Sequence, residues 1–80
     1  MKLPRSVSAA QLIKALARLG YLPTRQSGSH VRLVCRIDGH HSLTIPMHDP
    51  LRVGTLAAIL SDVAAQRKVS REDLVSLLFP

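Results

Sequence analysis

The stretch that decides the fold is residues 30–46, which reads HVRLVCRIDGHHSLTIP. Its first half predicts a strand from His30 to Ile37, because apolar and polar side chains alternate along it. Asp38-Gly39 is a strong signal for a tight hairpin turn, and a second strand follows over 40–46. The inward side chains of the first strand are expected to be Val31, Leu33, Cys35 and Ile37.

The same alternation places a second set of side chains on the opposite face of the sheet. In the first strand these are His30, Arg32, Val34 and Arg36. In the second strand the outward side chains are Ser42 and Thr44, and the inward ones are Leu43 and Ile45. One face of the hairpin is therefore apolar, and the other carries a histidine and two arginines.

A further strand is expected immediately before the hairpin, over residues 21–26. Pro23 places this strand at an edge of the sheet, because proline donates no hydrogen bond to a neighbouring strand. The segment Ser27-Gly28-Ser29 is a turn signal and leads directly into His30. The strands should therefore be joined by short turns and lie antiparallel.

Helices are expected on both sides of the strands. Ser8 and Gln11 form a capping-box pattern, which predicts a helix that ends at Gly20. An apolar stripe over 56–64 predicts a second helix, with Thr55 as its cap. A short last helix follows, with its cap and inner side chains at Ser70, Leu74, Leu77 and Leu78.

This order predicts a single α+β domain over residues 1–80. It has two layers, helix–three-stranded antiparallel sheet–helix, plus a short C-terminal helix, with both long helices on one face of the sheet. The chain of 80 residues can bury one modest core. No apolar run approaches the ~20 residues of a membrane span. With Cys35 as its one cysteine, the chain forms no internal disulfide, and we expect a cytoplasmic location and no membrane partner.

Positive charge is concentrated in the first part of the chain. Residues 1–36 carry seven basic and no acidic side chains, whereas residues 37–80 carry four basic and five acidic ones. A polyanion such as RNA is the natural partner of such a surface. The two aromatic residues are too few to stack bases, so contacts to phosphate and ribose are expected. The expected RNA-binding residues outside the hairpin include Lys14, Arg18 and Arg25.

His30 is the candidate for catalysis on the open face. A neutral imidazole can take the proton of a ribose 2′-hydroxyl, which then attacks the adjacent phosphate. Arg32 and Arg36 are expected to bind that phosphate, and so are the backbone N–H groups of Gly28 and Ser29. The second acid–base group is left open between Ser29, a cation, water and the RNA itself. An ordinary surface histidine is the plain alternative for His30.

The remaining histidines do not predict a metal site. Cys35 faces the core in this register, and no paired-ligand spacing occurs. We therefore expect no metal and no other cofactor. His40 and His41 are expected to decorate the hairpin, and His48 to form hydrogen bonds in a loop.

Several short segments, in this order, resemble the HicA family. They are Gly20-Tyr21, Gly28-Ser29-His30, Thr44-Ile45-Pro46-Met47-His48, Gly54-Thr55-Leu56, Ile59-Leu60 and Val69-Ser70-Arg71-Glu72-Asp73-Leu74. The resemblance covers about residues 8–78. Residues 61–69 form a longer connection than is usual in the family and lack its common glycine.

The resemblance implies a function as well as a fold. HicA proteins are toxins of bacterial and archaeal toxin–antitoxin pairs, and their fold is similar to the double-stranded RNA-binding domain. They act as mRNA interferases, and the histidine of the Gly-Ser-His motif, here His30, is their catalytic residue. A HicB antitoxin neutralises the toxin by covering this face. The resemblance thus implies a metal-independent endoribonuclease.

Two other functions remain open from the sequence. A non-catalytic RNA-binding module of similar fold would bind RNA without cleaving it. A partner-binding protein with no role in RNA chemistry is also possible, because a basic face suits an acidic antitoxin surface as well as it suits RNA. The strand signals disfavour a helix-turn-helix DNA-binding protein.

Overall fold

The computed structural model describes residues 3–4, 6–37 and 39–80. Helix α1 (Ala9–Ala17) is followed by the strands β1 (Leu22–Ser27), β2 (His30–Cys35) and β3 (His41–Pro46). Helices α2 (Val53–Arg67) and α3 (Arg71–Leu78) complete the order. The predicted α+β class and element order are confirmed. None of the described helices is long and apolar enough to cross a membrane.

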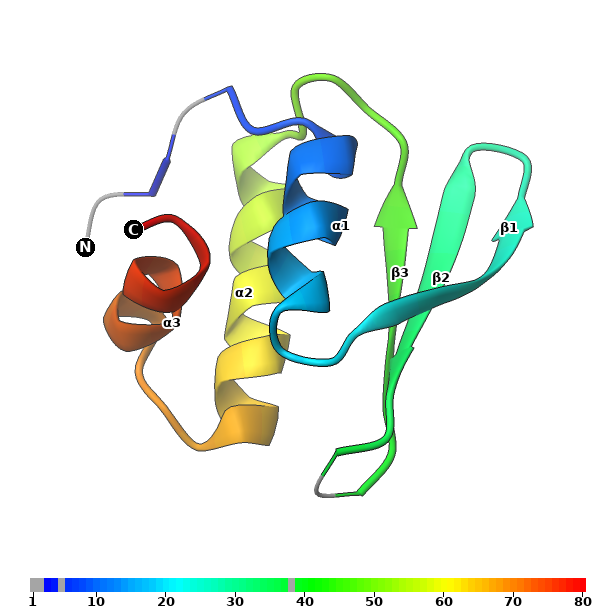
Figure 1. Ribbon diagram of the computed structural model, residues 1–80. Coiled ribbons are helices and arrows are strands. Elements are labelled where there is room, and N and C mark those ends of the chain that lie inside the picture. The colour runs from blue at the N-terminus through cyan, green and yellow to red at the C-terminus, as the bar shows by residue number, and fades with distance from the viewer. Residues whose placement is uncertain (1–2, 5, 38) are drawn as a thin grey trace.

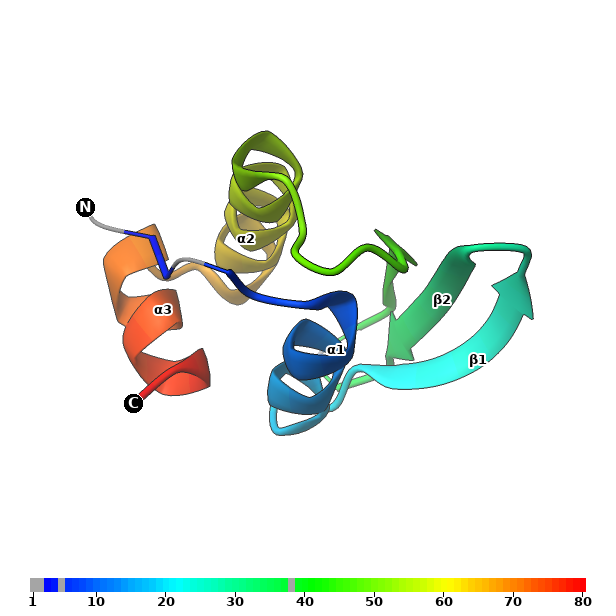
Figure 2. The same ribbon diagram turned by 90° about the horizontal axis from the view of Figure 1, so that it is seen from above.

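The three strands form one antiparallel sheet in the order β1-β2-β3. Helices α1 and α2 lie on one face of this sheet, and α3 lies on the far side of the helix pair (Figures 1 and 2). None of the described helices lies on the other face of the sheet. Strand β1 is an edge strand, as Pro23 predicted, and all its residues are exposed.

The core lies between the helices and the sheet. The inward residues of β2, Val31, Leu33 and Cys35, are buried as the alternation predicted. They pack in one cluster with the apolar stripe predicted for the second helix, Leu56, Ile59, Leu60, Val63 and Ala64. Burying a side chain such as Leu60 contributes roughly 1.5–3 kcal/mol, so this stripe holds α2 against the sheet.

The predicted starts of the first and last helices are confirmed by their hydrogen bonds, whereas α1 ends at Ala17, three residues before the predicted Gly20. Ser8 and Gln11 form a complete capping box at the start of α1. Ser70 caps α3 by accepting a bond from the backbone N–H of Asp73. Gly20 follows α1 with φ +94°, and a Cβ there would lie 2.5 Å from Cδ1 of Ile37. The chain therefore needs glycine at this turn.

The end of the long predicted strand is wrong. Strand β2 ends at Cys35, so the alternation stops before Ile37, whose side chain is 58% exposed. Arg36 lies beyond the strand as well. Asp38 of the predicted turn is outside the described residues, and Gly39 beside it has φ +113°.

Two details of the predicted helices are also wrong. Thr55 does not cap the second helix, because α2 begins earlier, with Arg52 as its N-cap, and has no side-chain cap. Leu77 was expected on the inner face of α3 but is 54% exposed. Leu74 and Leu78 are spaced i, i+4 and take the buried face of this two-turn helix, which leaves Leu77 on its flank.

Candidate nucleic-acid interface

His30 stands at the point where the β1–β2 turn enters β2. Gly28 adopts φ +58° in this two-residue turn, a conformation that favours glycine. The backbone N–H of Met47 donates to the carbonyl of Ser29 at 2.6 Å and ties the turn to the end of β3. His30 itself lies opposite Ser27 in β1 and Pro46 in β3. Its backbone is therefore fixed by both neighbouring strands.

Arg32 occupies the centre of the next row across the sheet on the same face. It lies opposite Arg25 in β1 and Thr44 in β3. Directly opposed residues of antiparallel strands point to the same face, so the two rows lie side by side. Together they line a shallow pocket of about 220 Å³, formed by Arg25, Ser27, His30, Arg32 and Thr44. We call it the open-face pocket, because it lies on the face without helices.

Strand β1 contains an irregularity next to Arg25. The register shifts between Pro23 and Arg25, so Thr24 is an extra residue in the strand. The Thr24 hydroxyl donates to the carbonyl of Arg32 at 3.3 Å and holds this bulge. Arg25 lies on the turn side of this bulge, two residues from Ser27, so regular alternation from the turn already places both side chains on the open face. The bulge instead reverses the faces of Pro23 and Leu22, which lie opposite Leu33 and Val34.

The open-face pocket is cationic, and its side chains are exposed. A guanidinium nitrogen of Arg32 donates to the hydroxyl of Ser42 at 3.1 Å, which holds Arg32 along the sheet. Among the described residues, none that lines the pocket is acidic, and none forms a hydrogen bond with the His30 ring. The imidazole is therefore available to a substrate that approaches this face.

The structure separates the other sequence-predicted site residues from one another. Gly28 and Ser29 form the turn next to the pocket. Arg36 lies past the end of β2 and does not line the pocket. Lys14 and Arg18 project from α1 into a separate hollow of about 270 Å³ beside α3. There Arg18 donates to the carbonyl of Leu78 at 3.1 Å, so it caps the end of α3.

Ser27 and Thr44 line the pocket but were not predicted as site residues. The signal for Thr44 was present, because the alternation of the second strand already turned it outward. The observed register pairs it with Arg32, whereas a two-residue turn at Asp38-Gly39 would have paired Arg32 with Ile45. Ser27 required the register of the first turn, which a single sequence specifies less well.

His41 does not decorate the hairpin, and that expectation was wrong. The Tyr21 hydroxyl and Nδ1 of His41 are 2.6 Å apart, and Nε2 of His41 lies 3.2 Å from a carboxylate oxygen of Asp62. The rings of Tyr21 and His41 meet edge to face, with centroids 5.6 Å apart. Burial raises the pKa of Tyr21 above its usual 10.0. His41 thus links the sheet to α2.

The described residues contain no group of three or more His, Cys, Asp or Glu side chains placed to hold a metal ion. Cys35 is buried, and its thiol donates to the carbonyl of Leu19 at 3.5 Å. This agrees with the core position predicted for the cysteine.

Comparison with protein families identifies the chain. Residues 9–64 match the family model described as the HicA toxin of bacterial toxin–antitoxin systems. The chain belongs to the HicA toxin family. The matched range contains α1, the whole sheet and most of α2, so it includes the open-face pocket. HicA toxins pair with an antitoxin, which makes this chain the toxin side of such a pair.

The match ends before the C-terminal part of the resemblance noted in the sequence. Residues 65–80, with the last turn of α2 and all of α3, lie outside it. No curated protein and no solved structure matches the chain significantly.

Proposed function

We propose that this HicA family member is an endoribonuclease that cleaves mRNA without a metal ion, with His30 as its general base and acid. One observation carries the proposal. The His30 ring is exposed, has no hydrogen bond to the described residues, and shares a pocket with Arg25 and Arg32. A general base needs a ring nitrogen without a hydrogen bond inside the protein, so that it can accept a proton from the substrate.

The proposed reaction begins at the ribose 2′-hydroxyl. His30 takes the hydroxyl proton, and the 2′-oxygen attacks the adjacent phosphorus. The bond from phosphorus to the 5′-oxygen breaks, which leaves a 2′,3′-cyclic phosphate on one fragment and a 5′-hydroxyl on the other. The protonated His30 or a water molecule gives the leaving oxygen its proton. Positioned acid–base catalysis of this kind contributes typically about 10²–10⁴-fold to the rate.

Arg25 and Arg32 bind the reacting phosphate in this proposal. Their guanidinium groups stand on neighbouring strands and face the same pocket. Planar guanidinium forks match phosphate oxygens and stabilise the charge that develops on them. The hydroxyls of Ser27 and Thr44 complete the lining. The backbone N–H groups of Gly28 and Ser29, in the adjoining turn, are the further phosphate contacts that we propose.

The mode of RNA binding is contact with the backbone. Tyr21 is fully buried, and Phe79 packs partly against the core, so neither offers a surface for base stacking. We therefore propose weak sequence preference and binding that falls steeply with salt. The protein partner in this proposal is a HicB-type antitoxin, which covers the open-face pocket. The whole of residues 1–80 acts as one toxin domain in the cytoplasm.

The test is to incubate the purified chain with mRNA in excess EDTA. Wild-type protein should cleave, and His30→Ala should not. His40→Ala is the matched control, because His40 is an exposed histidine outside the pocket. Equal cleavage by wild type and His30→Ala would end the assignment of His30. Intact RNA with retained, salt-sensitive binding would instead show a non-catalytic RNA-binding module.

A further inference from the structure

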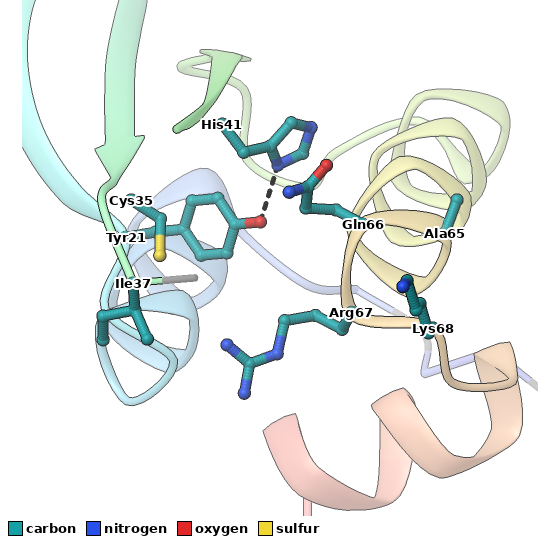
Figure 3. A pocket seen from close by; sticks show the side chains of 8 residues that line it. All are labelled: Tyr21, Cys35, Ile37, His41, Ala65, Gln66, Arg67 and Lys68. Carbon is teal, nitrogen blue, oxygen red and sulfur yellow. Dashed lines mark hydrogen bonds between the residues drawn. The ribbon is translucent and has the colours of Figure 1, made fainter. Parts of the chain in front are cut away.

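A second and larger pocket lies on the helix-bearing side of the sheet, at the end opposite to His30. Its volume is about 440 Å³, within the roughly 300–1,000 Å³ of small-molecule sites. The sheet side contributes Tyr21, Cys35, Ile37 and His41, and the end of α2 contributes Ala65, Gln66, Arg67 and Lys68 (Figure 3). We call it the α2 pocket.

The α2 pocket shares no lining residue with the open-face pocket. The family match ends at residue 64, so the whole α2 side of this pocket, 65–68, lies outside it. These residues also belong to the segment that is longer than usual for the family. The sheet side of the pocket lies inside the matched range, so the family match covers that half of the pocket and leaves out the half that carries the cations.

Its charge indicates an anionic ligand. Arg67 and Lys68 line the α2 pocket, and no described lining residue is acidic. The Arg67 side chain extends from α2 toward Tyr21 and Ile37 (Figure 3). Arg67 is half-buried, and within the described part of the chain its guanidinium has neither an ion pair nor a hydrogen bond. Its positive charge opposes the rise that burial causes in the pKa of Tyr21.

The wall opposite these cations is held in place by hydrogen bonds. Tyr21 is bonded to His41, and His41 to Asp62, so both nitrogens of the imidazole are occupied. The side-chain amide of Gln66 lies beside this pair (Figure 3). Tyr21 is fully buried and both nitrogens of His41 are already bonded, so this wall offers a ligand a fixed shape rather than new hydrogen bonds. A wall that needs no ordering favours binding.

Lys68 lies where α2 ends beside the α2 pocket. Lys68 ends α2 with φ +58°, a left-handed conformation that strongly favours glycine. The N–H groups of Lys68 and Val69 close the helix by donating to the carbonyls of Ala65 and Ala64. Glycine would form the same closure with less strain. This conformation ends α2 at the rim of the α2 pocket, which Lys68 lines.

We propose that the α2 pocket binds a small organic phosphate about the size of a nucleoside monophosphate. The Arg67 guanidinium holds the phosphate, because its planar fork matches phosphate oxygens, and Lys68 adds positive charge at the rim of the pocket. The organic part packs between Ile37 and Gln66, because the pocket is larger than a phosphate ion alone would fill.

The test is an NMR titration of the ¹⁵N-labelled chain with GMP, guanosine and inorganic phosphate. GMP should shift the amide signals of residues 35–37, 41 and 65–68. Guanosine should leave them in place, and inorganic phosphate should bind more weakly than GMP. Shifts confined to the open-face pocket, equal binding of guanosine and GMP, or no shifts at millimolar GMP would each overturn the proposal.

Variants separate this site from the cleavage site. Arg67→Gln should weaken GMP binding about tenfold or more, as expected for losing a charge-assisted bond. Arg52→Gln, at the exposed start of the same helix, should leave the affinity unchanged. His30→Ala should also bind GMP normally, so the result does not depend on the nuclease proposal. Full affinity in an Arg67→Gln protein with a native-like spectrum would contradict the assignment.

Discussion

His30 in β2 and His41 in β3 lie at opposite ends of the sheet and on its opposite faces. His30 begins the strand on the face without helices, whereas His41 lies opposite Cys35, the last residue of that strand, on the helix-bearing face. The ring of His30 has no hydrogen bond to the described residues, while both ring nitrogens of His41 are bonded. The same side chain is thus free for chemistry at one end and structural at the other.

The difference shows why a histidine must be judged by its partners. A bonded imidazole such as that of His41 has already used its donor and its acceptor, so it can offer neither to RNA. The imidazole of His30 keeps both and stands beside two arginines. Replacing His30 should therefore mainly lower the cleavage rate, whereas replacing His41 should mainly lower the stability of the fold.

The largest expected effect is on the rate of cleavage. His30→Ala should lower the rate by roughly 10²–10⁴-fold, because the general base is lost. His41→Ala should keep close to wild-type activity per folded molecule. Single-turnover cleavage, corrected for the folded fraction by circular dichroism, measures both rates. The comparison fails if His41→Ala loses activity as completely as His30→Ala.

The second effect is on the free energy of unfolding, and here the replacement of His41 has the larger effect. His41→Ala removes the partner of the buried Tyr21 hydroxyl, so the free energy of unfolding should fall by about 1–3 kcal/mol. His30→Ala should change it by less than about 0.5 kcal/mol, as for other exposed sites. Urea unfolding measures both values. A stable His41→Ala protein would show that its hydrogen bonds contribute little.

The third effect sharpens the description of the open face. Replacing both Arg25 and Arg32 by Gln should weaken RNA binding and reduce the slope of log affinity against log salt by roughly 1.4, for two phosphate contacts to single-stranded RNA. The matched pair is Lys14 and Arg18, which the sequence also proposed but which lie beside α3. Replacing both Lys14 and Arg18 by Gln should change the slope of log affinity against log salt by less. An equal change would extend the RNA surface to α1.

The smallest effect concerns alkaline pH. Tyr21 has a raised pKa in the folded protein, so above pH 10 the unfolded chain loses this proton first. The contribution of Tyr21 to stability is complete below pH 10 and declines as the pH rises through its folded pKa. Tyr21→Phe should remove that part of the decline between pH 9 and 11. Identical pH profiles of the two proteins in urea unfolding would contradict the raised pKa.

Local patterns predicted most of the fold and part of the candidate site. Alternation over residues 30–35 turns Val31 inward and His30 and Arg32 outward, because side chains of a strand point to opposite faces in turn. The same rule failed at Ile37, where the strand had already ended. Period-two patterns therefore specify faces well and strand ends poorly.

The remaining features depend on contacts between distant residues. The bulge at Thr24 reverses the faces of Pro23 and Leu22, which strict alternation cannot anticipate. The partners of His41, Tyr21 and Asp62, are 20 and 21 residues away from it in sequence. No local pattern marks such a triad, so His41 looked like an ordinary hairpin histidine until the fold brought its partners together.

The most direct test of the central claim is the chemistry of the cut RNA ends. If His30 removes a proton from the 2′-hydroxyl, the fragments made in EDTA must carry 2′,3′-cyclic phosphate and 5′-hydroxyl ends, and His30→Ala must produce none of them. Mass spectrometry of the fragments distinguishes these ends. Fragments with 3′-hydroxyl and 5′-phosphate ends would contradict attack by the 2′-oxygen and, with it, the role assigned to His30.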